Sequence, residues 1–89
     1  MYTIYFKINY SYGAFNHWYY ISKIIRPGDS YSPLEDSELM HQLDERVQLE
    51  LDEYFYPARR EAENCDIDLR IVSFQEYSAA SVLSKFDME

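Results

Sequence analysis

The sequence predicts an α+β fold: a two-layer sandwich in which one long helix covers one face of a three-stranded antiparallel sheet. Two segments with strand periodicity follow each other near the start of the 89-residue chain, separated by a short turn. A long amphipathic helical pattern comes next, and a third strand pattern follows it. A hairpin followed by a helical crossover places the first strand between the other two, so the expected order is 2-1-3 and the topology ββαβ(α). We expect residues 1–89 to form a single domain.

Residues 2–10 and 15–25 are expected to pair as a hairpin. Apolar or aromatic residues occupy every second position of 2–10, as in a strand with one apolar face. Gly13 lies in the turn, where its backbone can adopt a positive φ at low cost. Both faces of 15–25 are apolar or aromatic, so the pattern leaves open which face of this strand points to the core. The apolar face of the first strand comprises Tyr2, Ile4, Phe6, Ile8 and Tyr10.

The segment from Ser37 to Phe55 has the pattern of an amphipathic helix. Its apolar residues recur at spacings of three and four, which places them on one face. Asp36 or Ser37 is expected to cap its N-terminus. Pro57 is expected to kink this helix or to begin a second one, because the apolar spacing continues beyond it. The apolar stripe comprises Leu39, Met40, Leu43, Val47, Leu51 and Tyr54, and continues through Ala58, Ala62 and Cys65.

The rest of the chain predicts one more strand and a short C-terminal helix. The segment from Asp66 to Gln75 alternates at its start, with Asp68 and Arg70 on the outward face. Residues 78–86 carry apolar residues at helical spacing, so a helix is preferred there to a fourth strand. One long helix covers only one face of such a sheet, so the other face is expected to be partly open. The candidates to lie on that open face are Tyr5, Lys7, Trp18 and Tyr20.

The chain is acidic, and its charge is unevenly distributed. It has 16 acidic and 8 basic residues, a formal net charge of −8, and 47% apolar residues. The net charge is +2 over residues 1–34, −9 over 35–68 and −1 over 69–89. Duplex nucleic acid and anionic membranes would repel such a chain, so we expect neither as a direct partner. A basic protein surface fits the charge.

The sequence patterns of export and membrane insertion are not found in this chain. No apolar run approaches the length of about 20 residues that spans a bilayer, and residues 1–7 lack the features of a signal peptide. The only cysteine, Cys65, precludes an internal disulfide and fits a reducing compartment. We therefore expect a cytoplasmic protein in which Cys65 is a small buried hydrophobe.

The sequence carries no motif for catalysis or for binding a metal or a cofactor. His17 and His41 lack the sequence context of a nucleophilic site, and one cysteine with two distant histidines does not make a zinc site. Asp66 and Asp68 share a strand face, as in some magnesium-dependent nucleases, but Arg70 on that face favours a solvent-exposed charge pair. Two glycines are too few for a phosphate-binding loop. We expect neither an enzyme nor a cofactor.

The strongest candidate for a binding surface is the polar face of the helix over residues 37–55. Acidic residues recur on it over about five turns with almost no basic residue between them. Leu49 lies in the middle of this face, opposite the apolar stripe, where a large aliphatic side chain is a candidate contact. The expected partner-binding residues of the helix are Glu38, Asp44, Glu45, Gln48, Leu49, Asp52 and Glu53.

The ten tyrosines indicate a second candidate surface. Tyrosine is amphipathic and common in protein interfaces, and ten are too many for the core of a thin two-layer domain. Tyr5, Trp18 and Tyr20 on the open sheet face are therefore the alternative partner-binding residues, for an adaptor partner or for a homodimer. Stacking of unpaired nucleic-acid bases on these rings is a weaker alternative, because the net charge opposes it.

Rows of carboxylates on a helix can imitate the phosphates of a nucleic acid, so a basic groove that holds DNA or RNA would attract them. We expect a small acidic inhibitor or regulator that occupies a basic surface of a nucleic-acid-handling complex. In size and charge, the chain resembles inhibitors encoded by phages and other mobile elements, including anti-CRISPR and DNA-mimic proteins. The alternative is a structural or adaptor module that binds through its open sheet face.

Overall fold

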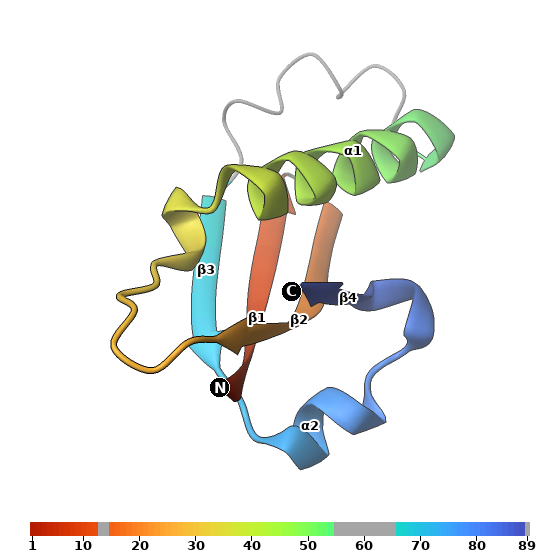
Figure 1. Ribbon diagram of the computed structural model, residues 1–89. Coiled ribbons are helices and arrows are strands. Elements are labelled where there is room, and N and C mark those ends of the chain that lie inside the picture. The colour runs from red at the N-terminus through yellow and green to blue at the C-terminus, as the bar shows by residue number, and fades with distance from the viewer. Residues whose placement is uncertain (13–14, 55–65, 89) are drawn as a thin grey trace.

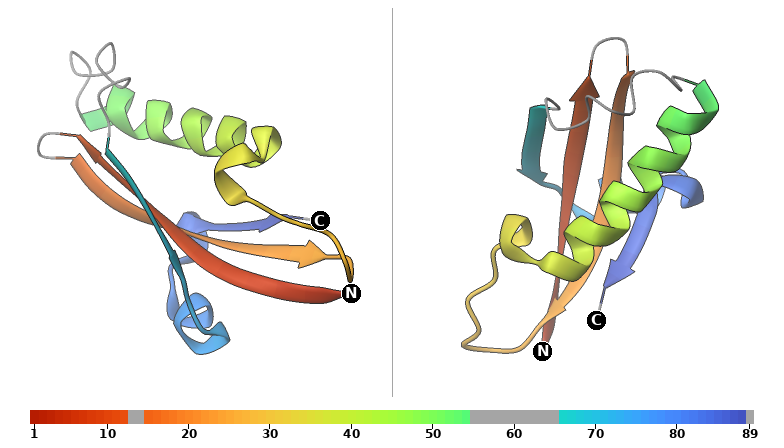
Figure 2. Two further views of the ribbon diagram at one scale, coloured as in Figure 1. Left: turned by 90° about the vertical axis from the view of Figure 1, so that its left-hand side faces the viewer. Right: turned by 90° about the horizontal axis from the view of Figure 1, so that it is seen from above.

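The chain folds around a twisted sheet with a helix on each face (Figures 1 and 2). The computed structural model describes residues 1–12, 15–54 and 66–88. Within them the sheet has four strands in the order β3-β1-β2-β4, with the long α1 on one face and the short α2 on the other. The elements are β1 (Tyr2–Tyr12), β2 (Phe15–Ile25), the 3-10 helix η1 (Pro33–Glu35), α1 (Ser37–Tyr54), β3 (Asp66–Ile71), α2 (Phe74–Ala79), the 3-10 helix η3 (Val82–Ser84) and β4 (Lys85–Met88).

The predicted hairpin of β1 and β2 forms the centre of the sheet. Its antiparallel register pairs Tyr2 with Ile25 and continues to the turn, so the two strands match along their whole length. The structure also settles which face of β2 is buried. Tyr19 and Ile21 lie opposite the apolar face of β1 and are fully buried, because directly opposite residues of paired strands share a face. Trp18 and its neighbours of the same parity point to the other side.

The hydrophobic core lies between the sheet and the apolar stripe of α1. Leu39 and Leu43 are fully buried and Val47 is 1% exposed. Each such side chain contributes about 1.5–3 kcal/mol through burial. The side chains of Leu51 and Tyr54, the last members of the predicted stripe, lie outside the described part of the chain. The core cluster comprises Phe6, Ile8, Tyr10, Tyr19, Ile21, Leu39, Leu43, Val47, Phe86 and Met88.

Asp36, one of the two predicted caps, begins α1. Its backbone carbonyl accepts the Met40 N–H at 2.9 Å, and its carboxylate accepts the Leu39 N–H at 3.2 Å. The same carboxylate accepts the Tyr31 hydroxyl at 2.7 Å and lies 3.9 Å from Lys23 Nζ. Burial opposes ionisation of Asp36, but these donors and the lysine charge outweigh it and lower the pKa of the carboxyl. The start of α1 is therefore fixed to β2 and to the preceding loop.

The prediction of a three-stranded, wholly antiparallel sheet is wrong, because β4 adds a fourth strand that pairs in parallel with β2. The predicted order 2-1-3 is found as the part β2-β1-β3 of the larger sheet. The preference for a helix over 78–86 is also wrong for the end of this range: α2 ends at Ala79 and η3 covers Val82–Ser84, but β4 begins at Lys85. Phe86 and Met88, 7% and 5% exposed, alternate with exposed or half-buried residues, and this period of two is masked in the sequence by the helical spacing of the residues before it.

The third strand is shorter than predicted, and a helix replaces its second half. β3 ends at Ile71, where the alternation of apolar residues breaks, and Ser73 caps α2 by accepting the Glu76 N–H. The predicted kink at Pro57 and the continuation of the stripe to Cys65 lie outside the described residues. None of the helices in the described ranges is long and apolar enough to cross a membrane.

Candidate partner-binding surfaces

The outer side of α1 carries exposed acids that have no arginine or lysine partner in the described part of the chain. Glu38, Asp44 and Glu45 are exposed. Among the described residues, Glu38 and Asp44 take part in no ion pair, and Glu45 contacts only His41, whose Nε2 lies 3.1 Å from its carboxylate. The negative charge of this side of the helix is therefore directed to solvent.

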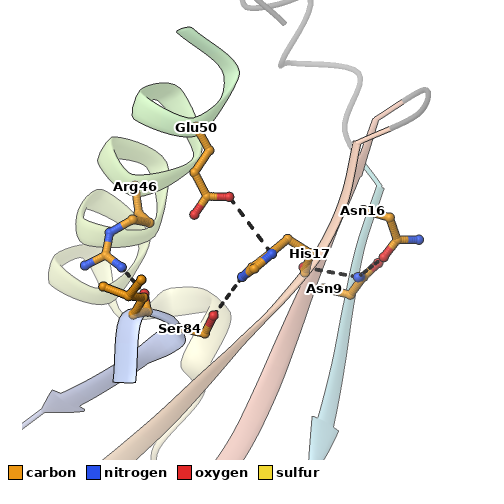
Figure 3. Close-up of polar contacts among 7 residues, drawn as sticks. Asn9, Asn16, His17, Arg46, Glu50 and Ser84 are labelled. Carbon is orange, nitrogen blue, oxygen red and sulfur yellow. Dashed lines mark hydrogen bonds and ion pairs between the residues drawn. The ribbon is translucent and has the colours of Figure 1, made fainter. Parts of the chain in front are cut away.

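Arg46 is the one arginine or lysine of α1, and its side chain points to the C-terminal segment (Figure 3). Its guanidinium donates a hydrogen bond to the Leu83 carbonyl and lies 5.0 Å from the centre of the Phe86 ring. Both contacts lie on the C-terminal segment. Arg46 thus ties α1 to η3 and β4, and it does not neutralise the outer side of its own helix.

The other predicted partner-binding residues of α1 differ in how exposed their side chains are. Leu49 is 66% exposed, as predicted. Gln48 is half-buried and already takes part in an interaction within the chain. Asp52 and Glu53 belong to α1, but their side chains lie outside the described part. We define the acidic face of α1 as the exposed residues Glu38, Asp44, Glu45 and Leu49.

Trp18 and Tyr20 lie on the sheet face away from α1, as predicted, but they are half-buried. Lys7 Nζ lies 4.5 Å from the centre of the Trp18 ring and 5.9 Å from that of the Tyr20 ring. The Arg70 guanidinium covers the Trp18 ring at 5.7 Å. A cation over an aromatic face at an exposed site contributes about 0.5–1 kcal/mol. These rings are therefore already engaged by cations of the same chain.

Tyr5 lies on the same sheet face, where α2 packs over it. Its ring centre is 5.4 Å from that of Phe74 and 5.1 Å from that of Tyr77. Glu76 of α2 also reaches Lys7 of β1, with 2.8 Å between carboxylate and ammonium. Tyr5 thus helps to hold α2 against the sheet. Trp18 and Tyr20, the other two predicted aromatic residues, contact cations instead.

Asp87 of β4 anchors the other side of α2. Its carboxylate accepts the Tyr77 hydroxyl and, at 2.7 Å, the Ser22 hydroxyl. These two donors lower the pKa of Asp87, whereas burial and then the Asp87 carboxylate raise the pKa of Tyr77. No local pattern in the sequence indicates this arrangement, because Ser22 and Asp87 are 65 residues apart.

A polar cluster joins β2, α1 and η3 at one end of the sheet (Figure 3). His17 Nε2 lies 2.8 Å from Ser84 Oγ, and His17 Nδ1 lies 4.0 Å from a Glu50 carboxylate oxygen. Beside it, Asn9 Nδ2 donates to Asn16 Oδ1 at 2.7 Å and to the His17 carbonyl at 3.1 Å. No local pattern marks this cluster in the sequence, since His17 and Ser84 are 67 residues apart.

The residue types Ser84, His17 and Glu50 are those of a hydrolase triad, but the geometry is that of a structural brace. Ser84 is only 8% exposed. Its N–H donates to the Ser81 carbonyl at 2.9 Å and the Lys85 N–H to the Val82 carbonyl, so both are engaged and offer no oxyanion site. The 4.0 Å between Glu50 and His17 also exceeds a hydrogen bond.

The acidic start of β3 contains the predicted charge pair. The Asp68 carboxylate lies 3.1 Å from Arg70 Nη2, and the side chain of Asp66 lies outside the described part. Within the described ranges, no three His, Cys, Asp or Glu side chains gather in a way that could hold a metal ion.

The comparisons with known proteins add no family to this description. No protein-family model matches the chain, and neither a curated protein nor a solved structure matches it significantly. A fold by itself does not determine a function, so the function has to be argued from the surfaces described above.

Proposed function

We propose that the protein is a non-enzymatic inhibitor or regulator that binds a basic, nucleic-acid-binding surface of a partner protein through the acidic face of α1. One observation carries the proposal: Glu38 and Asp44 have no ion-pair partner in the described chain, while Arg46 of the same helix is engaged elsewhere. A basic partner would supply the missing counter-charges, with fast and salt-sensitive association.

The acids of this face are spread along the helix and are not gathered at one point. Glu38 and Glu45 are two helical turns apart, about 10 Å at a rise of 1.5 Å per residue. The two carboxylates therefore form a row along the helix, which basic side chains of a phosphate-binding groove can contact. The buried stripe and the Asp36 cap hold the helix in place, which limits the entropy lost on binding.

Leu49 gives this face an apolar contact as well. It is 66% exposed beside the carboxylates, and an aliphatic side chain in an otherwise charged surface can fill a pocket that phosphates would not. A protein of this design acts by occupancy, as phage-encoded anti-CRISPR and DNA-mimic proteins do, and requires no catalytic residue.

The test is a binding panel of purified basic proteins that bind DNA or RNA, with and without competing duplex DNA. We expect at least one member to bind the protein and to be released by duplex DNA. We also expect the affinity to fall about tenfold or more between 50 and 200 mM salt. Binding that duplex DNA does not displace, or that salt does not weaken, would contradict the proposal.

Two matched double variants separate a specific face from net charge. Asp44→Lys/Glu45→Lys reverses the acidic face, and Asp29→Lys/Glu35→Lys makes the same change in net charge at exposed positions outside α1. The first variant should lose binding and the second should retain it. Equal losses would show that net charge alone is responsible.

The second candidate is an adaptor module that binds through the sheet face away from α1. The observation that favours it is that Trp18 and Tyr20 stay half-exposed, beyond the part of the face that α2 covers. Binding would then persist at high salt and would be lost in Trp18→Ala and Tyr20→Ala, while Asp44→Lys/Glu45→Lys would leave it unchanged.

A further inference from the structure

β3 is an edge strand whose outer side is unpaired in the described part of the chain. It is the last strand of the order β3-β1-β2-β4. In the left view of Figure 2 no other described element lies in front of it. Ile67 and Ile71 lie on its α1-facing side, yet they are 46% and 87% exposed. Exposed aliphatic side chains on an unpaired edge are typical of a strand that pairs with another chain.

The ladder between β1 and β3 fixes which backbone groups of β3 point outward. The Val72 N–H donates to the Tyr5 carbonyl at 3.0 Å, so these residues form a hydrogen-bonded pair. Such pairs alternate along an antiparallel ladder, and the N–H and C=O groups of Arg70 and Asp68 therefore also point to β1. Every second residue between them points its N–H and C=O away from the sheet. These outward residues are Ile67, Leu69 and Ile71.

A second copy of β3, antiparallel and centred on Leu69, satisfies all of these outward groups. In this register Ile67 lies opposite the second copy's Ile71, on the α1-facing side. Asp68 lies opposite the second copy's Arg70, on the other side. The charge pairs occupy non-hydrogen-bonded positions, where side chains of paired strands lie closest together. The strand is thus complementary to itself in shape, polarity and charge.

Other registers lack this complementarity. A shift by two residues in one direction places Asp68 opposite a second Asp68, and a shift in the other direction places Arg70 opposite a second Arg70. Like charges directly opposite each other are destabilising. A shift by one residue turns the aliphatic side chains toward the charged face and places outward backbone groups opposite inward ones.

We propose that a second copy of this chain binds this edge, so that β3 pairs with β3 about a two-fold axis and one continuous sheet runs through a homodimer. The axis stands perpendicular to the sheet, so the two copies of α1 lie on the same face. The pairing uses no residue of the acidic face of α1. The proposed dimer and the proposed function can therefore be tested independently, and the failure of one does not affect the other.

The test is sedimentation equilibrium of the full chain at about 150 mM salt, which screens the repulsion between two acidic copies. The wild-type chain should dimerise. Asp68→Arg and Arg70→Asp each place like charges opposite each other, and each should raise the dimer dissociation constant about tenfold or more. An equimolar mixture of the two variants should dimerise more tightly than either alone, because the two basic positions of one chain then face the two acidic positions of the other.

A backbone variant tests the same edge without changing charge. The N–H of Leu69 points outward, so Leu69→Pro removes a dimer hydrogen bond while sparing the ladder to β1. Circular dichroism should show the wild-type fold and sedimentation a monomer. A wild-type chain that stays monomeric up to about 1 mM overturns the proposal. So does a dimer that survives both charge variants, or a mixture no tighter than its components.

Discussion

The two faces of the molecule use charged residues in opposite ways. On the sheet face away from α1, charges are neutralised locally: Lys7 pairs with Glu76 at 2.8 Å and Arg70 with Asp68 at 3.1 Å. On the acidic face of α1, Glu38 and Asp44 have no ion-pair partner among the described residues. Local pairing makes the first face part of the fold, whereas the carboxylates of the second face point to solvent.

Exposure alone does not distinguish the two faces. The side chains of Asp68 and Glu45 are 51% and 65% exposed, so both would be classed as surface acids. The difference lies in their partners, since Asp68 faces an arginine and Glu45 only a histidine. Substitutions that remove a partner should therefore act on stability, and substitutions on the acidic face should act on binding.

Asp36 should give the largest effect on stability, because it is an acid at the start of α1 that has several partners. Asp36→Ala removes the helix cap and the acceptor of the Tyr31 hydroxyl. We expect the free energy of unfolding, measured with a chemical denaturant, to fall by about 1–3 kcal/mol. Asp36→Asn, which keeps a capping oxygen, should lose less. Equal stability of wild type and Asp36→Ala would contradict the assignment of the cap.

The carboxyl of Asp36 also determines the direction in which stability changes with pH. The pKa of Asp36 is lower in the folded chain than the unfolded value of about 3.9. Its stabilisation is therefore fully present above that pH and is lost as the pH falls through the folded pKa. As the pH is lowered, the free energy of unfolding of Asp36→Ala should therefore fall less than that of wild type. Asp87, whose pKa is also lowered, should contribute to the loss that remains.

The pair of Lys7 and Glu76 should give a smaller effect. Both side chains are partly exposed, at 20% and 44%, so solvent screens their attraction. A double-mutant cycle with Lys7→Met and Glu76→Gln should give a coupling free energy of about 0.5–1 kcal/mol. A coupling free energy of zero would show that charge on this sheet face is not neutralised locally.

Replacement of the acidic-face residues should affect stability least. Asp44 and Glu38 are exposed and take part in no ion pair among the described residues. In Asp44→Ala and in Glu38→Ala, the free energy of unfolding should stay within about 0.5 kcal/mol of wild type. A larger loss in thermal or chemical denaturation would mean that these acids belong to the fold.

Local periodicity predicted the central part of the fold. The alternation in residues 2–10 and the helical stripe of Leu39, Leu43 and Val47 each have a single structural solution, and the structure confirms both. The C-terminal part was harder because its signals conflict. Residues 78–86 have helical spacing, while Phe86 and Met88 join the core where β4 pairs with β2, a contact between distant segments.

For the candidate surfaces, the sequence predicted which helix residues are exposed, because exposure follows from helix geometry. Leu49 and the acids Glu38, Asp44 and Glu45 are exposed because the opposite face is buried. The sequence could not show that Arg46 turns to Leu83, that α2 covers Tyr5, or that Lys7 and Arg70 cover Trp18. Apart from the contact of the hairpin neighbours Lys7 and Trp18, these contacts join residues far apart in the chain, so no spacing rule reveals them.

The most direct test of the acidic face is the salt dependence of affinity for the tightest-binding basic protein of the panel. It is measured for wild type, for Asp44→Lys/Glu45→Lys and for Asp29→Lys/Glu35→Lys. The acidic-face variant should bind about tenfold or more weakly, with a shallower salt slope, while the control variant keeps the wild-type slope. Equal losses of affinity and slope in the two variants would contradict the claim that this face of α1 is the binding surface.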